Sequence, residues 1–206
     1  DDILIPSVAY RLLQQDESIG YVRLSRFSAE SGEEVADALL DLSEQGATSY
    51  ILDLRQNGGG LRDAAVDVAD QFLDDGPILI QQSRDEGERV FEATNDTLIP
   101  DAPVIVLVDN GTASAAEIVA GALRDRQRAQ LIGNEPTFGK GSVQSVFDLS
   151  DGSSVHVTSA RWLTPNGTQL DGEGLELDIA VEVTQDALDN GRDEVLDRAI
   201  KELSQE

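Results

Sequence analysis

Ser49-Tyr-Ile-Leu-Asp-Leu-Arg-Gln-Asn-Gly-Gly-Gly60 joins a buried-type strand to a run of three glycines, and the apolar spacing from Ala64 to Leu73 then predicts a helix. Glycines between a strand and a helix allow backbone N–H groups to converge on one point, which suits an anion or an oxyanion. A tight turn that needs only the freedom of the glycine backbone explains the same residues equally well. The dinucleotide fingerprint G-x-G-x-x-G is a poor fit, because Arg62 and Asp63 occupy its later positions.

The same order of strand, loop and helix recurs along the chain, which predicts an α/β domain with helices packed on sheets. Apolar runs indicate strands at residues 3–8, 19–27, 49–54, 103–108 and 130–132, and a hairpin of residues 143–149 and 153–163. Helical spacing indicates helices at residues 31–45, 64–73 and 115–123, and a closing helix that begins at Asp186 or Asp193. Ser31 and Glu34 predict a capping box at the start of the first helix. No linker divides the chain, so we expect one domain over residues 1–206.

Charge and composition argue against several classes of function. The chain carries 15 basic and 40 acidic residues, and its net charge of −25 repels nucleic acid and anionic membranes. It has no cysteine and one histidine, so neither a thiol nucleophile nor a zinc site is expected, and no cofactor is predicted. No apolar run approaches the length of a membrane span. An acidic surface poor in lysine suits salty surroundings, and a bias toward solubility explains it as well.

Asp109-Asn-Gly-Thr-Ala-Ser-Ala-Ala-Glu-Ile118 places Ser114 between a strand and the start of a helix. The helix dipole and the free N–H groups there favour a forming oxyanion, so Ser114 is a candidate nucleophile. A serine is also a preferred N-cap residue, which explains the position without any catalysis. The nucleophile-elbow pattern G-x-S-x-G is not present, because Thr112 and Ala116 replace its glycines.

Pro136-Thr-Phe-Gly-Lys-Gly-Ser-Val-Gln144 holds Lys140, one of only two lysines, between two glycines. An arginine would serve as well as a surface charge, but only a lysine can lose its proton in a buried site and act as a base. The alternative is an exposed lysine in a glycine turn. The stretch is not a P-loop, because Asn134 and Gly141 stand at positions that need glycine and serine or threonine.

Two other groups of side chains are expected to be structural. His156 alternates with Val155 and Val157 in a predicted strand, which indicates a histidine on the hairpin surface. Arg124, Arg126 and Arg128 are most simply a solvated helix end.

Five segments, in chain order, resemble the carboxyl-terminal processing proteases, also called tail-specific proteases. They are Ile19-Gly-Tyr-Val-Arg-Leu24, Leu52-Asp-Leu-Arg-Gln-Asn-Gly-Gly-Gly60, Thr112-Ala-Ser-Ala-Ala-Glu117, Gly133 with Glu135-Pro-Thr-Phe-Gly-Lys-Gly-Ser-Val-Gln144, and Leu163-Thr-Pro-Asn-Gly167 with Gly172 and Gly174-Leu-Glu-Leu-Asp178. The resemblance implies a crotonase-like or Clp-protease-like spiral of strand–strand–helix units. It also implies a serine protease that cleaves near the C-terminus of protein or peptide substrates with free C-termini.

The resemblance assigns roles to individual residues. Ser114 would attack the scissile carbonyl, Lys140 would accept its proton as the neutral amine, and Gln144 would orient the lysine. The oxyanion hole would come from backbone N–H groups of Gly59 or Gly60 and of Ala115. Supporting positions, expected to be structural, are Glu117, Asp125 and Thr137.

The family resemblance also implies an extracytoplasmic location and an upstream PDZ domain, so we expect this chain to be a catalytic core whose isolated activity is weak. Any membrane association would come from segments outside the chain. Departures from the family pattern are Gly58 in place of proline, Ala116 in place of serine and one extra residue near Asn134. Two alternatives remain: a non-catalytic ligand- or peptide-binding module on the same fold, and an acyl-CoA enzyme of the crotonase type. The apolar wall that would desolvate Lys140 is expected from Val119, Phe138 and Val143.

Overall fold

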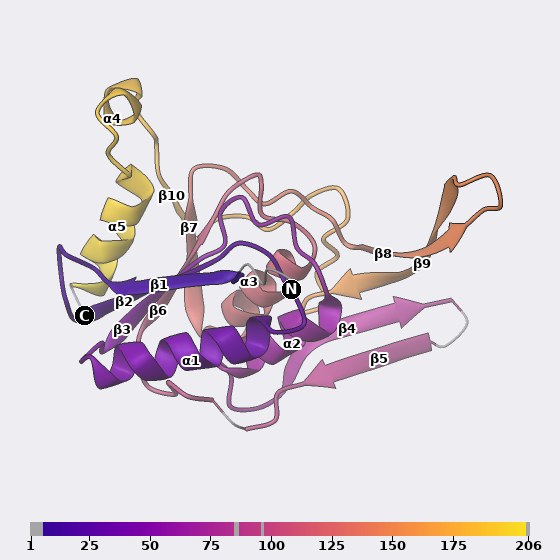
Figure 1. Ribbon diagram of the computed structural model, residues 1–206, viewed down its shortest axis with the longest axis horizontal. Helices are drawn as coiled ribbons and strands as arrows, with labels where there is room; N and C mark the ends of the chain where they lie inside the picture. The colour runs from indigo at the N-terminus through magenta and orange to yellow at the C-terminus, as the bar shows by residue number, and fades with distance from the viewer. Residues whose placement is uncertain (1–5, 85–86, 96, 205–206) are drawn as a thin grey trace, which may run out of the picture.

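The computed structural model describes residues 6–84, 87–95 and 97–204, and within these ranges its strands form two sheets (Figure 1). The first has the order β1-β2-β3-β6-β7-β10, with bounds Val8–Leu12, Ile19–Leu24, Ser49–Asp53, Val104–Val108, Ala129–Gly133 and Ile179–Ala180. Its neighbouring strands are parallel, except that β1 is antiparallel to β2. The second sheet is antiparallel in the order β5-β4-β9-β8, with bounds Gly87–Glu92, Pro77–Ser83, Ser154–Leu163 and Ser142–Asp148.

Helices cover both faces of the six-stranded sheet. Side chains of alternate residues on a strand point to opposite faces, so Leu52 and Val106 join the core under one set of helices and Ile51 and Ile105 join the other core. The helices on the first face are α1 (Ser31–Glu44), α2 (Arg62–Asp70) and α3 (Ala115–Asp125). On the second face lies α5 (Glu194–Leu203), which follows the short α4 (Gln185–Asp189). The predicted α/β class is confirmed.

Most predicted strands and helices occur, but some details of the prediction were wrong. The first strand, β1, runs from Val8 to Leu12, so the strand predicted at residues 3–8 overlaps it only at Val8, and residues 3–5 lie outside the described ranges. The residue before α1 is Glu30, and the Glu34 carboxylate accepts a hydrogen bond from the Ser7 backbone instead of closing a capping box with Ser31. The hairpin of β4 and β5 was not predicted at all. For the closing helix, the predicted start at Asp193 is confirmed, because Asp193 caps α5, and the short helix that precedes it is separate.

The three arginines at the end of α3 are not a solvated helix end. Each of them binds a different segment of the chain: Arg124 pairs with Asp178, Arg126 pairs with Asp75, and Arg128 donates to the Phe72 and Ile99 carbonyls. They fasten this end of α3 to its surroundings. The side chain of His156 lies outside the side chains that the structure describes, so its predicted surface position is untested.

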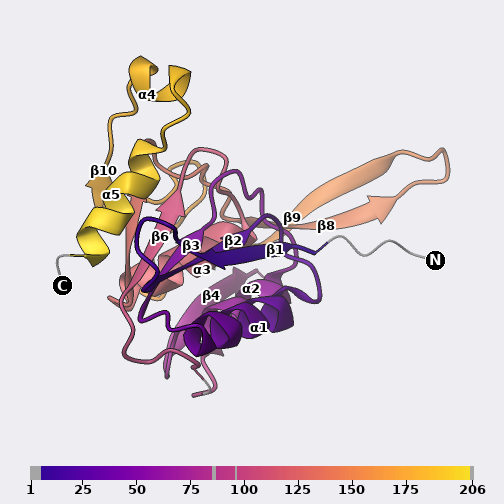
Figure 2. The same cartoon turned by 60° about the vertical axis from the view of Figure 1, so that its left-hand side comes forward.

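The topology brings three loops to one edge of the larger sheet. Strands β3, β6 and β7 are parallel neighbours, so the segments that follow their carboxyl ends leave the sheet on the same side. These segments contain the glycine run, the predicted serine and the predicted lysine. A hairpin of β8 and β9 projects from this region, away from the rest of the molecule (Figures 1 and 2). Among the described helices, none combines the length and apolar character of a membrane span.

Candidate active site

The glycine loop after β3 is held by a buried asparagine. The Asn57 side chain donates to the Leu24 carbonyl at 2.8 Å and accepts from the Gly59 N–H at 2.9 Å. Gly59 has a φ of +98°, and a Cβ atom there would lie 2.8 Å from the Ser114 Cβ atom. Both the backbone conformation and the close approach therefore require glycine. The consequence is that the glycine loop lies directly against Ser114.

The loop after β6 is tied to the glycine loop by hydrogen bonds. The Asp109 carboxylate accepts from the Gln56 backbone at 2.9 Å and from the Gln56 side chain at 2.7 Å. The Ala113 N–H donates to the Asn57 carbonyl at 2.9 Å. These contacts make the two loops one rigid unit around Ser114.

Ser114 is the residue before α3, and its backbone is strained. Its φ of 56° and ψ of −118° differ from the extended geometry of an ordinary N-cap serine. Strained non-glycine residues of this kind concentrate at functional sites, because the surrounding structure has to hold them. The half-buried Ser114 therefore has a conformation that capping alone does not explain.

The Glu117 carboxylate connects the serine to the lysine loop. The side chain is fully buried and accepts four hydrogen bonds at 2.6–2.9 Å, from the backbone N–H groups of Ser114, Gly139 and Lys140 and from the Thr137 hydroxyl. The Ser114 and Lys140 N–H groups donate to the same oxygen, Oε2. Glu117 and Thr137, predicted as supporting residues, therefore lie together between the serine and the lysine.

The lysine loop is anchored on both sides of Lys140. The Gly139 carbonyl accepts from Gly172, and the Gly141 carbonyl accepts from Trp162, both at 2.8 Å. Cβ atoms at the two glycines would collide with the backbone of residues 170–174, so glycine is needed at both. The backbone of the lysine loop is thus fixed, whereas the Lys140 side chain is exposed.

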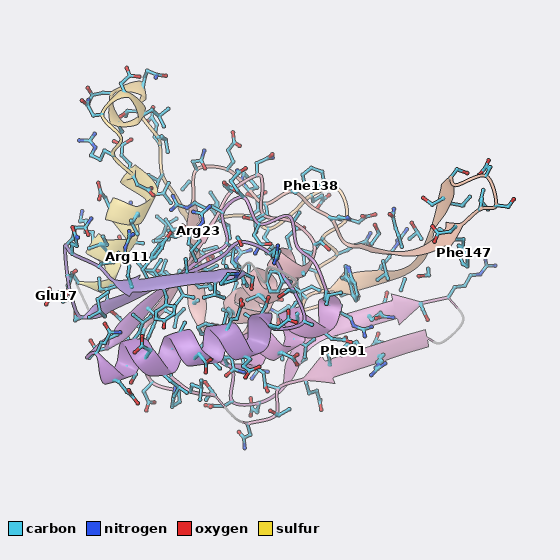
Figure 3. The ribbon with its side chains drawn as sticks, viewed as in Figure 1. Arg11, Glu17, Arg23, Phe91, Phe138 and Phe147 are labelled. Atoms are coloured by element: carbon cyan, nitrogen blue, oxygen red, sulfur yellow. The ribbon has the colours of Figure 1, made fainter. Side chains whose placement is uncertain are left out.

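The predicted apolar wall around Lys140 does not form. Phe138 is 61% exposed, although its own N–H is fixed to the Thr112 carbonyl at 2.9 Å (Figure 3). Val119 lies inside the core, and Val143 is only partly buried. The neighbouring Thr137 side chain is the one that is buried, against Glu117, and Phe138 lies on the solvent side.

The remaining predicted residues are spread more widely. Ala115 is the first residue of α3, and within the described residues neither its N–H nor that of Gly60 donates a hydrogen bond, whereas the Gly59 N–H is already paired with Asn57. Gln144 lies on β8 with an exposed side chain. Asp125 lies at the opposite end of α3, roughly 15 Å along the helix from Ser114, and accepts from the Asn166 N–H.

A buried ion network behind the glycine loop was missed by the sequence analysis. The fully buried Asp53 carboxylate accepts from the Tyr21 hydroxyl and from Arg55, both at 2.6 Å, and Arg55 also pairs with Asp193 before α5. Burial by itself would raise the pKa of Asp53, but hydrogen bonds and the charge of Arg55 outweigh it and lower this pKa. Burial and the Asp53 charge raise the pKa of Tyr21. The sequence signal that could have predicted this network is an aspartate and an arginine two residues apart at the end of a strand.

A separate cavity in the described part of the chain lies away from the predicted catalytic residues. A cavity of about 530 Å³ lies at the far end of α3, among Arg124, Arg128, Asp178 and Glu202, and none of the predicted active-site residues lines it. Within the described residues, histidine and carboxylate side chains do not gather in groups that could hold a metal.

The chain has the mixed α/β fold of its solved neighbours. The chain belongs to peptidase family S41, whose family model matches residues 18–181. It is 49% identical over 166 residues to a carboxyl-terminal-processing protease of Synechocystis sp., which covers 81% of this chain and 38% of that protein. It is 44% identical over 177 residues to carboxyl-terminal-processing peptidase 1, chloroplastic, of Arabidopsis thaliana, covering 84% of this chain and 36% of that protein.

A solved structure supports the same assignment. The photosystem II D1 C-terminal processing protease superposes with a TM-score of 0.77 at 36% identity, covering 88% of this chain and 50% of that one. The chain thus spans less than half the length of the two curated relatives and half of the solved chain.

Proposed function

We propose that this chain is the catalytic core of a serine endopeptidase that cleaves near the free C-termini of protein or peptide substrates. Ser114 is the nucleophile, Lys140 is the general base and Gln144 orients the lysine. Family membership and the processing-protease relatives support the reaction class. The chemistry of the strained serine beside a glycine loop supports the residue assignment.

One observation carries the assignment of Ser114 and Lys140. Their backbone N–H groups donate to one oxygen of Glu117, at 2.9 and 2.8 Å, although the two residues are 26 positions apart in the sequence. A lysine with a merely solvated role does not need its backbone fixed to the same atom as a strained serine. The shared acceptor holds the backbones of the two residues close to the same atom. A rotation of the lysine side chain then brings its amine toward the Ser114 hydroxyl.

The reaction then follows the logic of a serine–lysine pair. The Ser114 oxygen bonds to the scissile carbonyl carbon while its proton passes to the neutral Lys140 amine. The carbonyl oxygen becomes an oxyanion, which accepts hydrogen bonds from the Ala115 N–H and, in the glycine loop, from the Gly60 N–H. The intermediate expels the amine of the leaving peptide, which takes the proton from Lys140. Water then cleaves the acyl-enzyme by the same steps in reverse and restores the serine.

The exposed Lys140 side chain indicates an open site. A lysine acts as a base only when it is neutral, and removal from water favours the neutral amine. A bound substrate covers the lysine from the solvent side and supplies this desolvation. Because the loop backbone is already anchored, closure requires movement of the side chain rather than refolding of residues 139–141. On the family assignment, we place the protein in an extracytoplasmic compartment.

Labelling with a fluorophosphonate tests the proposal directly. We expect one covalent adduct per chain by intact mass spectrometry, located on Ser114 by peptide mapping. Ser114→Ala should abolish the adduct, and Ser204→Ala, which changes an exposed serine after α5, should leave it unchanged. A chain that takes no label and cleaves no unstructured peptide would instead support the binding-module alternative.

A further inference from the structure

The hairpin of β8 and β9 extends beyond the sheet to which it belongs. Strand β9 pairs with β4 only through Ala160 to Leu163, whereas its pairing with β8 continues outward to Ser154. The outer part is therefore a two-stranded ribbon that projects from the body of the molecule (Figures 1 and 2). A ribbon of two strands is marginally stable in water by itself, so its side chains are expected to find a partner.

One face of this ribbon is apolar and exposed. Phe147 lies directly opposite Val155 in the register, and Val157 follows two residues later on the same face. Their exposed fractions are 55%, 43% and 46%, and Leu149 beyond the end of β8 is 47% exposed. Figure 3 shows Phe147 on the projecting part of the hairpin. Contiguous exposed apolar side chains of this kind mark an interaction surface.

We propose that this apolar face, with the edge strand β8, binds an extended apolar segment of the polypeptide substrate outside the catalytic site; this inference rests on the proposed function. Strand β8 begins at Ser142, two residues after Lys140, so the surface continues directly from the catalytic loop. Because β8 is the last strand of its sheet among the described residues, an extended segment can add to it through backbone hydrogen bonds. Backbone hydrogen bonds form with a segment of any sequence, so the apolar side chains of the hairpin provide the preference for apolar segments.

The negative charge of the chain limits which substrate segments can bind to the hairpin. The chain carries a net charge of −25, and Asp148 and Asp151 lie at the end of the hairpin itself. An acidic segment is repelled there, and so is a second copy of this chain. The surface therefore suits an unstructured segment that is apolar and either neutral or basic.

The geometry also sets a minimum length. Phe147 follows Lys140 by seven residues in the chain, and strand β8 covers most of that interval. At about 3.3 Å per residue, an extended substrate has to reach roughly 20 Å from the catalytic loop to contact Phe147. Short peptides fall short of the hairpin, whereas protein tails reach it.

Binding to the inactive Ser114→Ala variant tests the proposal. The probe is a fluorescent, unstructured, apolar peptide of about fifteen residues, long enough to span the distance to the hairpin. The variant Phe147→Thr/Val155→Thr/Val157→Thr removes the apolar face and keeps residues that favour strands. The matched control is Val90→Thr, which changes an equally exposed valine on β5, the opposite edge of the same sheet.

We expect the triple variant to weaken the anisotropy-derived affinity by about tenfold and the control by less than about twofold. The same peptide with glutamates in place of its apolar residues should bind weakly to every variant. Urea unfolding checks that the triple variant is folded. If it is not folded, the single variant Val157→Thr replaces it, and we expect a smaller loss of affinity in the same direction.

Equal affinity for the triple variant, equal loss in the control, or no binding by the parent would overturn the proposal. So would a dimer in sedimentation that the triple variant converts to a monomer, because a second copy would then cover the face. The proposed function fails separately: hairpin-dependent binding without cleavage by the wild-type chain contradicts the peptidase, whereas cleavage with hairpin-independent binding contradicts only this inference.

Discussion

The backbone N–H of Lys140 lies 2.8 Å from the buried carboxylate of Glu117, which also accepts from Ser114. A single side chain in the first turn of α3 thus joins two loops that follow different strands. Removal of this carboxylate should separate the loops without removing any group that reacts with substrate.

Glu117→Gln should lower kcat by about 10²-fold, because a displacement of about 1 Å between reacting groups is enough for such a loss. The amide nitrogen of glutamine is a hydrogen-bond donor, and the groups that surround it here are also donors. We therefore expect a loss of about 1–3 kcal/mol in the free energy of unfolding as well. Peptide hydrolysis and urea unfolding measure the two effects. Glu135→Gln, at an exposed position in the segment that precedes Lys140, is the control. Similar activity in both variants would mean that the four hydrogen bonds are dispensable.

Lys140→Arg should be nearly as inactive as Lys140→Ala, with kcat/KM reduced by at least about 10²-fold in both. A guanidinium cannot give up its proton and so cannot act as the base. Lys201→Arg changes the other lysine, on α5, and should leave the rate unchanged. Appreciable turnover by Lys140→Arg would show that Lys140 supplies only charge.

Gly59→Ala should abolish activity and destabilise the fold, because its Cβ atom would meet the Ala113 carbonyl, the Ser114 side chain and the Ala115 N–H within 2.8–2.9 Å. The adjacent Gly58 has open space around it, so Gly58→Ala should retain activity. Thermal unfolding and peptide hydrolysis of the two variants, measured side by side, check this contrast. If Gly58→Ala were the more damaging change, the arrangement of the glycine loop against Ser114 would be wrong.

Arg55→Met should destabilise the fold at neutral pH by about 3–5 kcal/mol, because it leaves the buried Asp53 carboxylate without its main partner. The pKa of Asp53 is lowered in the folded state, so the unfolded state binds the proton more tightly and stability rises with pH. This contribution is complete above the ordinary aspartate value of about 4 and is lost as the pH falls through the lower folded value.

Urea unfolding at pH 7 and at successively lower pH values measures the Arg55→Met effect, and the difference from wild type should shrink toward acid as Asp53 gains its proton. The control is Arg62→Met, whose partner Asp63 is exposed; it should cost less than about 1 kcal/mol. A deficit for Arg55→Met that stays constant from neutral to acid pH would rule out Asp53 as its origin.

The sequence by itself determined the order of the elements and the chemistry of the loops. Continuous apolar runs such as Val104–Val108 specify buried parallel strands, and apolar spacing of 3.6 residues specifies the helices, because both depend on neighbours close in the chain. The scarcity of lysine and the serine at a helix start were enough to single out Lys140 and Ser114 as candidates.

Tertiary structure alone decided how these candidates relate to one another. In the sequence alone, Glu117 is an ordinary acidic residue of a first helical turn, Asn57 is a turn residue and Phe138 is an apolar residue near the lysine. Their burial and hydrogen-bond partners cannot be predicted from the sequence, because these depend on segments that are distant in it. The fold buries Glu117 beneath two loops, gives Asn57 the Leu24 carbonyl and turns Phe138 to solvent. The exposed face of the β8–β9 hairpin arises in the same way, since alternation predicts an apolar face, and only the packing of the other elements determines whether anything covers it.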